Sequence, residues 1–355
     1  MIALAERIPV AVLGATGAVG QTFIRLLDGH PWFQLAEISA SDRSAGKSYR
    51  DAARWIGGDM PASVGRMTVL PTSPDAVQSP LVFSALDAAV AGDVEAAFAR
   101  AGRFVLSNAR NFRMEEDVPL LIPEVNPDHL ALLDGQRAAR GWDGAIVTNA
   151  NCAAIVIVMA LAPLHTAFGV RKLFVATMQA VSGAGYPGVP SLDILGNVIP
   201  YIGQEEEKIE SETQKLLGTL DGRRVRKAPI VVSAHANRVP VENGHTVCLS
   251  VGLDRPASPE AAMDAIEQWR GAISGLGLPS APERPLILTR DIDRPQPRRD
   301  VSAAGGMAVT VGRVRTDRLL DLRLVASGHN TIRGAAGASI LNAELLVSRG
   351  LVGAP

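Results

Sequence analysis

Residues 9–27 read PVAVLGATGAVGQTFIRLL, and this stretch decides the fold. The apolar run at 9–13 predicts a short strand, and the spacing of apolar residues over 21–27 predicts a helix. A glycine turn joins them; it comprises Gly14, Thr16, Gly17, Ala18, Val19 and Gly20. In such a turn, backbone amides approach a pyrophosphate at a helix N-terminus. Alone, the pattern also fits a tight turn that binds nothing, and the next strand bears on that choice.

The second strand is predicted at 34–40, and its end lies where a dinucleotide places its adenosine ribose. Ser41, Arg43 and Ser44 follow it and offer a cation and two hydroxyls suited to a 2'-phosphate. They favour NADP over NAD. Asp42 stands among them and would instead bond the ribose hydroxyls of NAD, and Arg43 also fits a solvated loop cation, so both alternatives stay open.

Further strands are predicted at 81–86, 103–107 and 144–148, with a helix at 93–100. Strands that alternate with helices indicate a parallel, doubly wound α/β sheet. Arg110 and Arg113 in SNARNFRM, residues 107–114, follow a strand's C-terminal end, the edge at which open α/β sheets bind ligands. An anionic substrate is a candidate partner for either one.

Composition excludes several classes of protein. The chain has 355 residues, 47% hydrophobic and 20% charged, which fits two globular domains. Its net charge of -1 gives no field for nucleic acid or an anionic membrane. The longest apolar run, 153–162, precedes Pro163 and has about half of the roughly 20 residues that a membrane span needs. We therefore expect no membrane and no nucleic-acid partner.

The cysteines and histidines give further limits. Two cysteines, Cys152 and Cys248, form neither a disulfide framework nor a CxxC pair, which favours a reducing, cytoplasmic setting. None of the six histidines has a metal-ligand spacing, so we expect no metal. Cys248 lies between apolar neighbours in the predicted strand 245–253, and we expect it to be structural and buried.

Cys152 follows Asn149, Ala150 and Asn151 and begins the predicted helix 153–162. A helix N-terminus lowers the pKa of a thiol, and the thiolate is the reactive form. The interpretation as a small structural cysteine remains open at this point. His245 ends a loop close to a glycine, where a general acid or base fits, although an ordinary surface histidine fits as well.

These segments together resemble the aspartate-β-semialdehyde dehydrogenase family, in particular its archaeal and fungal-like branch, along nearly the full chain. The motifs that carry the resemblance are GATGAVG (14–20), SNARNFRM (107–114), NANC (149–152), QAVSGAGYPGVPSLDILGNVIPYI (179–202), EEEKIESET (205–213), NRVPVENGHT (237–246), DRPQPRRD (293–300) and HNTIRGAAGASILNAE (329–344). The set is far more specific than any one of its members.

The resemblance implies a catalytic group. Cys152 would be the nucleophile that forms a thioacyl intermediate, and His245 the acid or base. Gln179 would orient the intermediate, and Asn151 would support the oxyanion. The implied reaction is reductive dephosphorylation of L-aspartyl-β-phosphate by NADPH, in lysine, threonine and methionine biosynthesis.

The resemblance also implies the binding residues. Arg238 would bind the substrate's α-carboxylate, and Glu205 would face its amino group. Arg113 and Lys208 would hold the phosphate. Three further residues would lie beside the nicotinamide: Ser182, Gly183 and Asn330.

The predicted architecture has an N-terminal Rossmann-type domain with a parallel sheet over 1–145, completed by a C-terminal helix over about 328–355. An α+β catalytic and dimerisation domain with a mixed sheet would occupy 146–327. Relatives form dimers and tetramers, so the resemblance implies a homodimer or homotetramer, with Val189 to Leu220 at the subunit contact. The apolar residues of that segment would serve equally in an intramolecular core.

Two other functions remain open. The first is a paralogue that reduces an acyl-CoA such as malonyl-CoA, or a modified acyl-phosphate of a specialised pathway, on the same scaffold. The second is a catalytically silent protein that binds NADP.

Overall fold

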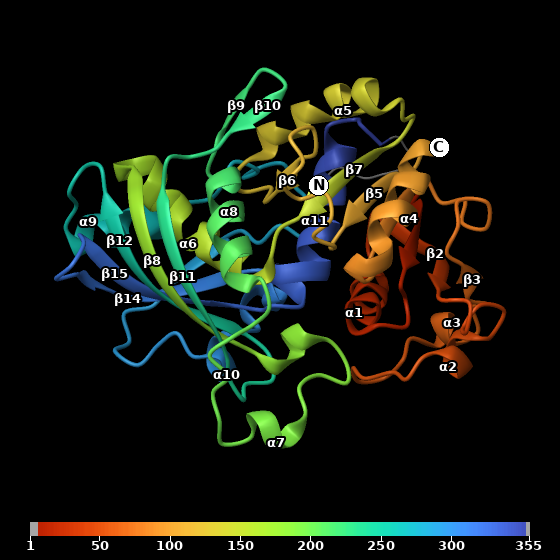
Figure 1. Ribbon diagram of the computed structural model, residues 1–355, viewed down its shortest axis with the longest axis horizontal. Helices are drawn as coiled ribbons and strands as arrows, with labels where there is room; N and C mark the ends of the chain where they lie inside the picture. The colour runs from red at the N-terminus through yellow and green to blue at the C-terminus, as the bar shows by residue number, and fades with distance from the viewer. Residues whose placement is uncertain (1–5, 353–355) are drawn as a thin grey trace.

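The computed structural model describes residues 6–352 and has two lobes, which lie side by side in Figure 1. One lobe is built on a seven-stranded sheet and the other on a six-stranded sheet. The ends of the predicted first domain, residues 1–5 and 353–355, lie outside the described residues.

The first sheet is entirely parallel, in the order β3-β2-β1-β4-β5-β7-β6. Its strands are β1 (Ile8–Leu13), β2 (Phe33–Ala40), β3 (Leu70–Pro71), β4 (Leu81–Ser84), β5 (Phe104–Ser107), β6 (Leu120–Leu121) and β7 (Ala145–Asn149). Strands such as LVFS in β4 are buried throughout, because helices cover both faces of a parallel sheet. The strand order reverses between β1 and β4, which is the point where such sheets bind ligands.

The helices of this lobe include the two that the sequence predicts. They are α1 (Ala18–Leu27), α2 (Tyr49–Ala52), α3 (Ala62–Gly65), α4 (Ala88–Arg100) and α5 (Leu132–Arg140), with a 3-10 helix at Pro127–Ala131. The chain end returns here, since the π-helical turn Ile332–Ala336 leads into α11 (Gly337–Ser348). Ile340, Leu341 and Leu345 of α11 belong to the same buried cluster as strands of the first sheet. Figure 1 shows α11, blue, beside β5 and β7.

The second sheet is mixed, in the order β11-β8-β12-β15-β14-β13. Its strands are β8 (Val170–Gln179), β11 (Val231–Arg238), β12 (His245–Leu253), β13 (Leu286–Leu288), β14 (Val309–Thr316) and β15 (Leu322–Gly328). The pairs β11–β8 and β13–β14 are parallel, and the other three are antiparallel. The parallel sheet in one lobe and the mixed sheet in the other confirm the predicted α/β fold class.

The helices of the second lobe place the site. They are α6 (Cys152–Phe168), α7 (Ser191–Ile194), α8 (Glu205–Leu216), α9 (Pro259–Gln268) and α10 (Pro297–Asp300), with 3-10 helices at Val181–Ala184 and Ala303–Gly306 and the hairpin β9 (Thr219–Asp221) and β10 (Arg224–Arg226). The prediction that one helix ends at residue 162 is wrong, because α6 continues past Pro163. Burial of residues 153–164 against the second sheet outweighs the backbone hydrogen bond that Pro163 cannot donate.

Candidate active site

Cys152 and His245 meet at the start of α6. Cys152 is the first residue of α6, and His245 is the first residue of β12. Cys152 Sγ lies 3.1 Å from His245 Nε2, although the residues are 93 positions apart in sequence. The N-cap of α6 is Asn151, whose side-chain oxygen accepts hydrogen bonds from the amides of Ala153 and Ala154. A thiol is therefore held at a helix N-terminus within hydrogen-bond reach of an imidazole.

The imidazole has a defined tautomer. The backbone N–H of Ala180 donates to His245 Nδ1 at 3.1 Å, so Nδ1 carries a lone pair. Burial, reinforced by Arg238 and His329, lowers the pKa of His245 to about 3. The neutral ring then carries its proton on Nε2, which donates toward the Cys152 sulfur. In this arrangement the Nε2–H of His245 can stabilise a thiolate by a hydrogen bond.

Burial dominates the electrostatics of the thiol. It raises the pKa of Cys152 to about 12, helped by the nearby Glu205, while Arg113 and Arg238 act in the opposite direction. The helix N-terminus does lower the pKa of the thiol, through the Ala153 amide, but burial outweighs that contribution. The sequence shows the helix start but not the apolar surroundings that favour the uncharged thiol.

Charged residues of α8 surround Asn151. The Asn151 side-chain amide donates to Glu205, and the Asn151 backbone N–H donates to Glu212 at 2.6 Å. Lys208 Nζ lies 3.5 Å from the carboxylate of Glu205. Arg113 reaches the same cluster from the loop after β5 and forms an ion pair of 2.9 Å with Glu212. The structure thus brings both predicted phosphate ligands to the start of α6.

The other predicted site residues gather on the His245 side. Arg238 is buried at the end of β11, and its Nη1 donates to the carbonyl of Ala180 at 2.7 Å. Gln179, at the end of β8, is 1% exposed. Asn330 Nδ2 donates to Ser182 Oγ at 2.8 Å, and Asn330 Oδ1 accepts from Gly244 N. The segment between β15 and the π-helical turn is therefore joined to the loop after β8 beside the Cys–His pair.

The glycine turn has the close approaches that a dinucleotide site needs. Gly14 has a φ of +72°, and a Cβ there would lie 2.6 Å from the Ala85 carbonyl oxygen. A Cβ at Gly20 would collide with the Gly14 carbonyl oxygen. Gly17, at the N-cap of α1, is exposed and leaves the helix amides accessible. These residues fit a pyrophosphate at the start of α1.

The predicted 2'-phosphate residues follow β2. Ser41, Asp42 and Arg43 are exposed and Ser44 is half-buried, in a turn where Ser44 N donates to Ser41 O at 2.8 Å. All four therefore lie at the C-terminal edge of the parallel sheet, as a ribose site requires. Arg43 forms no ion pair with any described residue.

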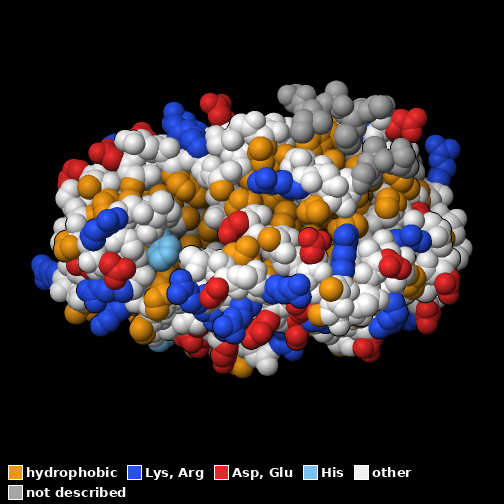
Figure 2. Space-filling view, turned by 90° about the horizontal axis from the view of Figure 1, so that it is seen from above, with side chains coloured by type: hydrophobic (Ala, Val, Ile, Leu, Met, Phe, Trp, Pro, Cys, Tyr) orange, Lys and Arg blue, Asp and Glu red, His pale blue; other side chains and the backbone are white. Residues whose placement is uncertain are grey.

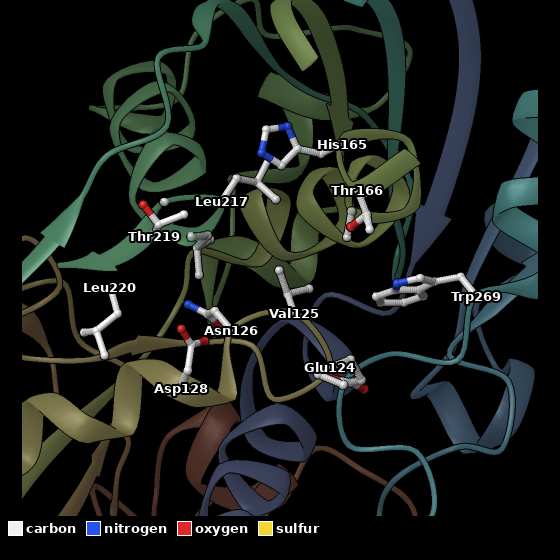
Figure 3. Close-up of a pocket in the computed structure, with 14 residues that line it drawn as sticks. Glu124, Val125, Asn126, Asp128, His165, Thr166, Leu217, Thr219, Leu220 and Trp269 are labelled. Atoms are coloured by element: carbon white, nitrogen blue, oxygen red, sulfur yellow. The ribbon is translucent and has the colours of Figure 1, made fainter. Parts of the chain in front are cut away.

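Two cavities contain predicted site residues, and a third does not. One of about 300 Å³ is lined by Arg110, Arg113, Lys208 and Glu212. Another of about 790 Å³ runs between α1 and the loop after β8 and includes Ser182. Figure 3 shows a third, of about 410 Å³, around Glu124, His165 and Trp269. This third cavity contains none of the predicted site residues.

Two residues of the cluster escaped sequence analysis, Glu212 and Lys215. Both are buried on α8, and Lys215 Nζ donates to the carbonyls of Arg113, Glu115 and Val118 at 2.7, 2.7 and 2.8 Å. The available signal was spacing. Charged side chains at 205, 208, 212 and 215 recur every three or four positions, which puts them on one face of a helix.

The prediction that Cys248 is buried is also wrong. Cys248 is exposed on β12, because the side chains of Val247 and Leu249 point into the core and alternate with it. It shares the outer sheet face with Phe174, whose exposure is 44%.

Charges of both signs are mixed on the surface. Figure 2 shows Lys and Arg side chains interspersed with Asp and Glu on one face of the molecule, with no large area of one sign. Within residues 6–352, no group of three or more potential ligands is arranged for a metal ion. No helix in that range is long and apolar enough to cross a membrane.

Comparisons with known proteins cover both lobes. Residues 9–133 match the semialdehyde dehydrogenase NAD binding domain, and residues 161–333 match the semialdehyde dehydrogenase dimerisation domain. The chain belongs to the semialdehyde dehydrogenase family. The match to two semialdehyde dehydrogenase domains confirms the resemblance drawn from the motifs, and Cys152 lies in the stretch between them.

Individual relatives are similar over their whole length. The aspartate-semialdehyde dehydrogenase of Archaeoglobus fulgidus is 51% identical over 347 residues, 98% of this chain and 100% of that protein. That of Schizosaccharomyces pombe is 46% identical over 354 residues, 97% of this chain and 99% of the relative. A crystal structure of aspartate semialdehyde dehydrogenase with NADP from Candida albicans superimposes with a TM-score of 0.91 at 43% identity, covering 97% and 100% of the two chains. The archaeal and fungal branches of the family are both represented.

Proposed function

We propose that this chain is an NADP-dependent, phosphorylating aspartate-semialdehyde dehydrogenase. In the biosynthetic direction it converts L-aspartyl-β-phosphate to L-aspartate-β-semialdehyde. The observation that carries the proposal is the contact of 3.1 Å between Cys152 Sγ and His245 Nε2. It lies at a helix N-terminus, with Arg113 and Arg238 close enough to act on the pKa of the thiol. Relatives at 51% and 46% identity with the same activity in their names support it.

Cys152 is the proposed nucleophile. Its sulfur attacks the acyl carbonyl, the carbon–oxygen bond to phosphate breaks, and a thioester forms on the cysteine. The thiol proton leaves with the phosphate, so the step is balanced. The side chain of Asn151 stabilises the oxyanion with the Nδ2 proton that is not donated to Glu205, and Gln179 orients the acyl group. When the sulfur carries negative charge, it accepts a hydrogen bond from His245 Nε2–H.

The substrate's own charges fit the surrounding residues. Arg238 binds the α-carboxylate, and Glu205 faces the ammonium group. Arg113 and Lys208 bind the phosphate and stabilise it as it leaves. An acyl-CoA has no phosphate at the reacting carbon, so this pair of cations favours the acyl-phosphate over the acyl-CoA function.

The remaining predicted residues would hold the cofactor. NADPH would supply the hydride that reduces the thioester. The turn from Gly14 to Gly20 would receive the pyrophosphate, and Ser182, Gly183 and Asn330 would line the nicotinamide side. Ser41, Arg43 and Ser44 would bind the 2'-phosphate, which would make the chain prefer NADP over NAD despite Asp42. When the reduced adduct collapses, a proton from solvent returns to the sulfur and the aldehyde is released.

The test is oxidation of aspartate semialdehyde with NADP, followed at the nicotinamide absorbance. It is run with phosphate, without phosphate, and with CoA in place of phosphate. We expect phosphate-dependent NADPH formation, and its loss in Cys152→Ala. A rate that requires CoA would instead establish the acyl-CoA function. No rate under any condition, with NADP binding retained, would establish the silent protein.

We also propose the domain division and the assembly. A cofactor domain over 1–145, completed by about 328–355, and a catalytic domain over 146–327 are supported by the return of α11 to the first sheet. A homodimer is supported by the outer face of the second sheet, where Phe174, Val231 and Cys248 are exposed. Light scattering of Phe174→Asp should show a monomer where the unaltered chain is dimeric.

The loop carrying α7 supports a larger assembly. Leu192, Leu195, Val198 and Tyr201 are 91%, 67%, 53% and 69% exposed, an apolar surface suited to the subunit contact within Val189 to Leu220. A homotetramer would cover it.

Two free thiols support a reducing, cytoplasmic site of action in lysine, threonine and methionine biosynthesis. Cell fractionation tests the compartment.

A further inference from the structure

Glu212 joins two parts of the site that come from different lobes. It is 2% exposed. One carboxylate oxygen forms the ion pair of 2.9 Å with Arg113 Nη1, and the other accepts the Asn151 backbone N–H at 2.6 Å. Arg113 follows the last residues of β5, whereas Asn151 directly precedes Cys152. The Glu212 carboxylate thus bonds two groups. One is the Arg113 guanidinium beside the 300 Å³ cavity, and the other is the backbone N–H of Asn151, the residue before Cys152.

The Arg113 guanidinium is fixed on two sides. Nη1 is bonded to Glu212, and Nη2 donates to the Asn108 carbonyl at 2.7 Å. Arg113 also lines the 300 Å³ cavity. The two bonds therefore set which edge of the guanidinium faces the cavity, and Glu212 makes one of them.

The backbone under Arg113 is fixed from the same helix. Lys215 Nζ donates to three carbonyls, those of Arg113, Glu115 and Val118. Lys215 lies three residues after Glu212, on the same face of α8. One residue of α8 thus holds the main chain of the arginine, and the other holds its side chain.

A purely structural role does not account for this arrangement. Buried ion pairs are weak contributors to stability, since desolvation offsets their attraction, and apolar packing would serve a core at least as well. Here both oxygens of the Glu212 carboxylate bond groups of the site, one to the charged guanidinium of Arg113 and the other to the peptide N–H of Asn151. Such bonds fix direction, which matters when a phosphate and an acyl carbon must be placed together.

We infer that Glu212 is a positioning residue, which aligns the phosphate-binding edge of Arg113 with the Asn151–Cys152 peptide. The inference rests on the proposed function. It predicts that Glu212 acts on phosphate binding through Arg113 and leaves the cofactor side of the site alone.

Glu212→Gln is the informative variant, because the amide oxygen still accepts from Asn151 N–H while the ion pair with Arg113 is lost. We expect KM for phosphate to rise about tenfold or more, as for a misdirected charge-assisted hydrogen bond. KM for NADP should stay within about twofold. Glu210→Gln is the matched control: Glu210 lies on the same helix and accepts a backbone N–H, that of Ala234 at 3.1 Å, outside the site. It should leave all constants unchanged.

A double-mutant cycle tests the route. In an Arg113→Gln background, Glu212→Gln should raise KM for phosphate by no more than about twofold further. Glu212→Asp keeps the charge, retracts the carboxylate and should give a smaller rise, which keeps the test available if Glu212→Gln does not fold.

Two results would overturn the inference: an unchanged KM for phosphate in folded Glu212→Gln, or additive effects in the cycle. Failure of the proposed function has a different signature, since the unaltered chain would then show no phosphate-dependent rate at all.

Discussion

The buried ion pair between Glu124 and Arg333 gives a prediction that can be worked through in full. Arg333 is 0% exposed and Glu124 is 2% exposed. Two parallel hydrogen bonds of 2.6 and 2.7 Å join the guanidinium to the carboxylate. Arg333 lies in the π-helical turn whose next residue, Gly334, packs against Cys152 so closely that a Cβ there would lie 2.7 Å from the cysteine Cβ. The pair therefore fastens the segment beneath the nucleophile to the first lobe.

Glu124→Ala should leave a guanidinium buried with little compensation. Within residues 6–352, the guanidinium has one other hydrogen-bond partner besides Glu124, the Met159 sulfur at 3.1 Å from Nη2, and Nε has none. Removing one partner of a buried pair costs about 3–5 kcal/mol, a large share of a total stability of about 5–15 kcal/mol. We expect urea unfolding followed by circular dichroism to show this loss as a lower midpoint at unchanged m-value.

Two comparisons isolate the cause. Glu267→Ala breaks an exposed pair with Arg290, whose side chains are 49% and 63% exposed, and should cost at most about 1 kcal/mol. The double variant Glu124→Leu, Arg333→Met removes both charges and should recover most of the stability. If Glu124→Ala cost no more than Glu267→Ala, or the double variant were less stable than the single one, the reasoning about the buried charge would be refuted.

Three further predictions follow from the same electrostatics and packing. Burial raises the pKa of Glu95 to about 7 from 4.5, so the folded state binds more protons in that window and stability falls as pH rises through it; Glu95→Gln should remove this loss of about 3 kcal/mol between pH 5 and pH 8 in urea unfolding. Glu205 helps to raise the pKa of Cys152, so Glu205→Gln should speed iodoacetamide labelling of Cys152, measured by mass spectrometry with Cys248 as the unchanged reference. Gly14→Ala should raise KM for NADP at least about tenfold, because its φ is +72° and the new Cβ meets a backbone oxygen; an unchanged KM would contradict the fit of the glycine turn to the cofactor.

The first lobe was predictable because its signals are local. The strands predicted at 9–13, 34–40 and 103–107 are short runs beside glycine turns or helices and correspond to β1, β2 and β5. The parallel arrangement follows from strand–helix alternation. The second sheet was predicted only as mixed. Its order pairs β8 with β11 and β12, strands separated by long connections, and no local pattern specifies that choice. Burial likewise explains why α6 runs through Pro163.

The site divides in the same way. The family motifs supplied Cys152, His245 and the charged residues, but the contacts Cys152–His245 and Arg113–Glu212 join positions 93 and 99 residues apart. Glu212 had a usable signal in its helical spacing. Cys248 had a usable signal too, because side chains alternate along a strand and Cys248 therefore lies on the face of the sheet away from Val247. The raised pKa of Cys152 had no such signal, because it depends on how much of the surrounding protein excludes water.

That raised pKa changes how the proposed chemistry must proceed. A thiol whose pKa is about 12 beside a neutral imidazole carries almost no charge at rest. On the proposed mechanism the thiolate therefore appears only as the acyl phosphate arrives, when Arg113 and Lys208 bind a dianion and the thiol proton has a departing phosphate to accept it. The cations lower the free energy of the transition state more than that of the resting thiol, which is the condition for catalysis rather than for tight binding alone. The N-terminus of α6 and His245 then stabilise the thiolate while it exists. Burial keeps the thiol unreactive between turnovers.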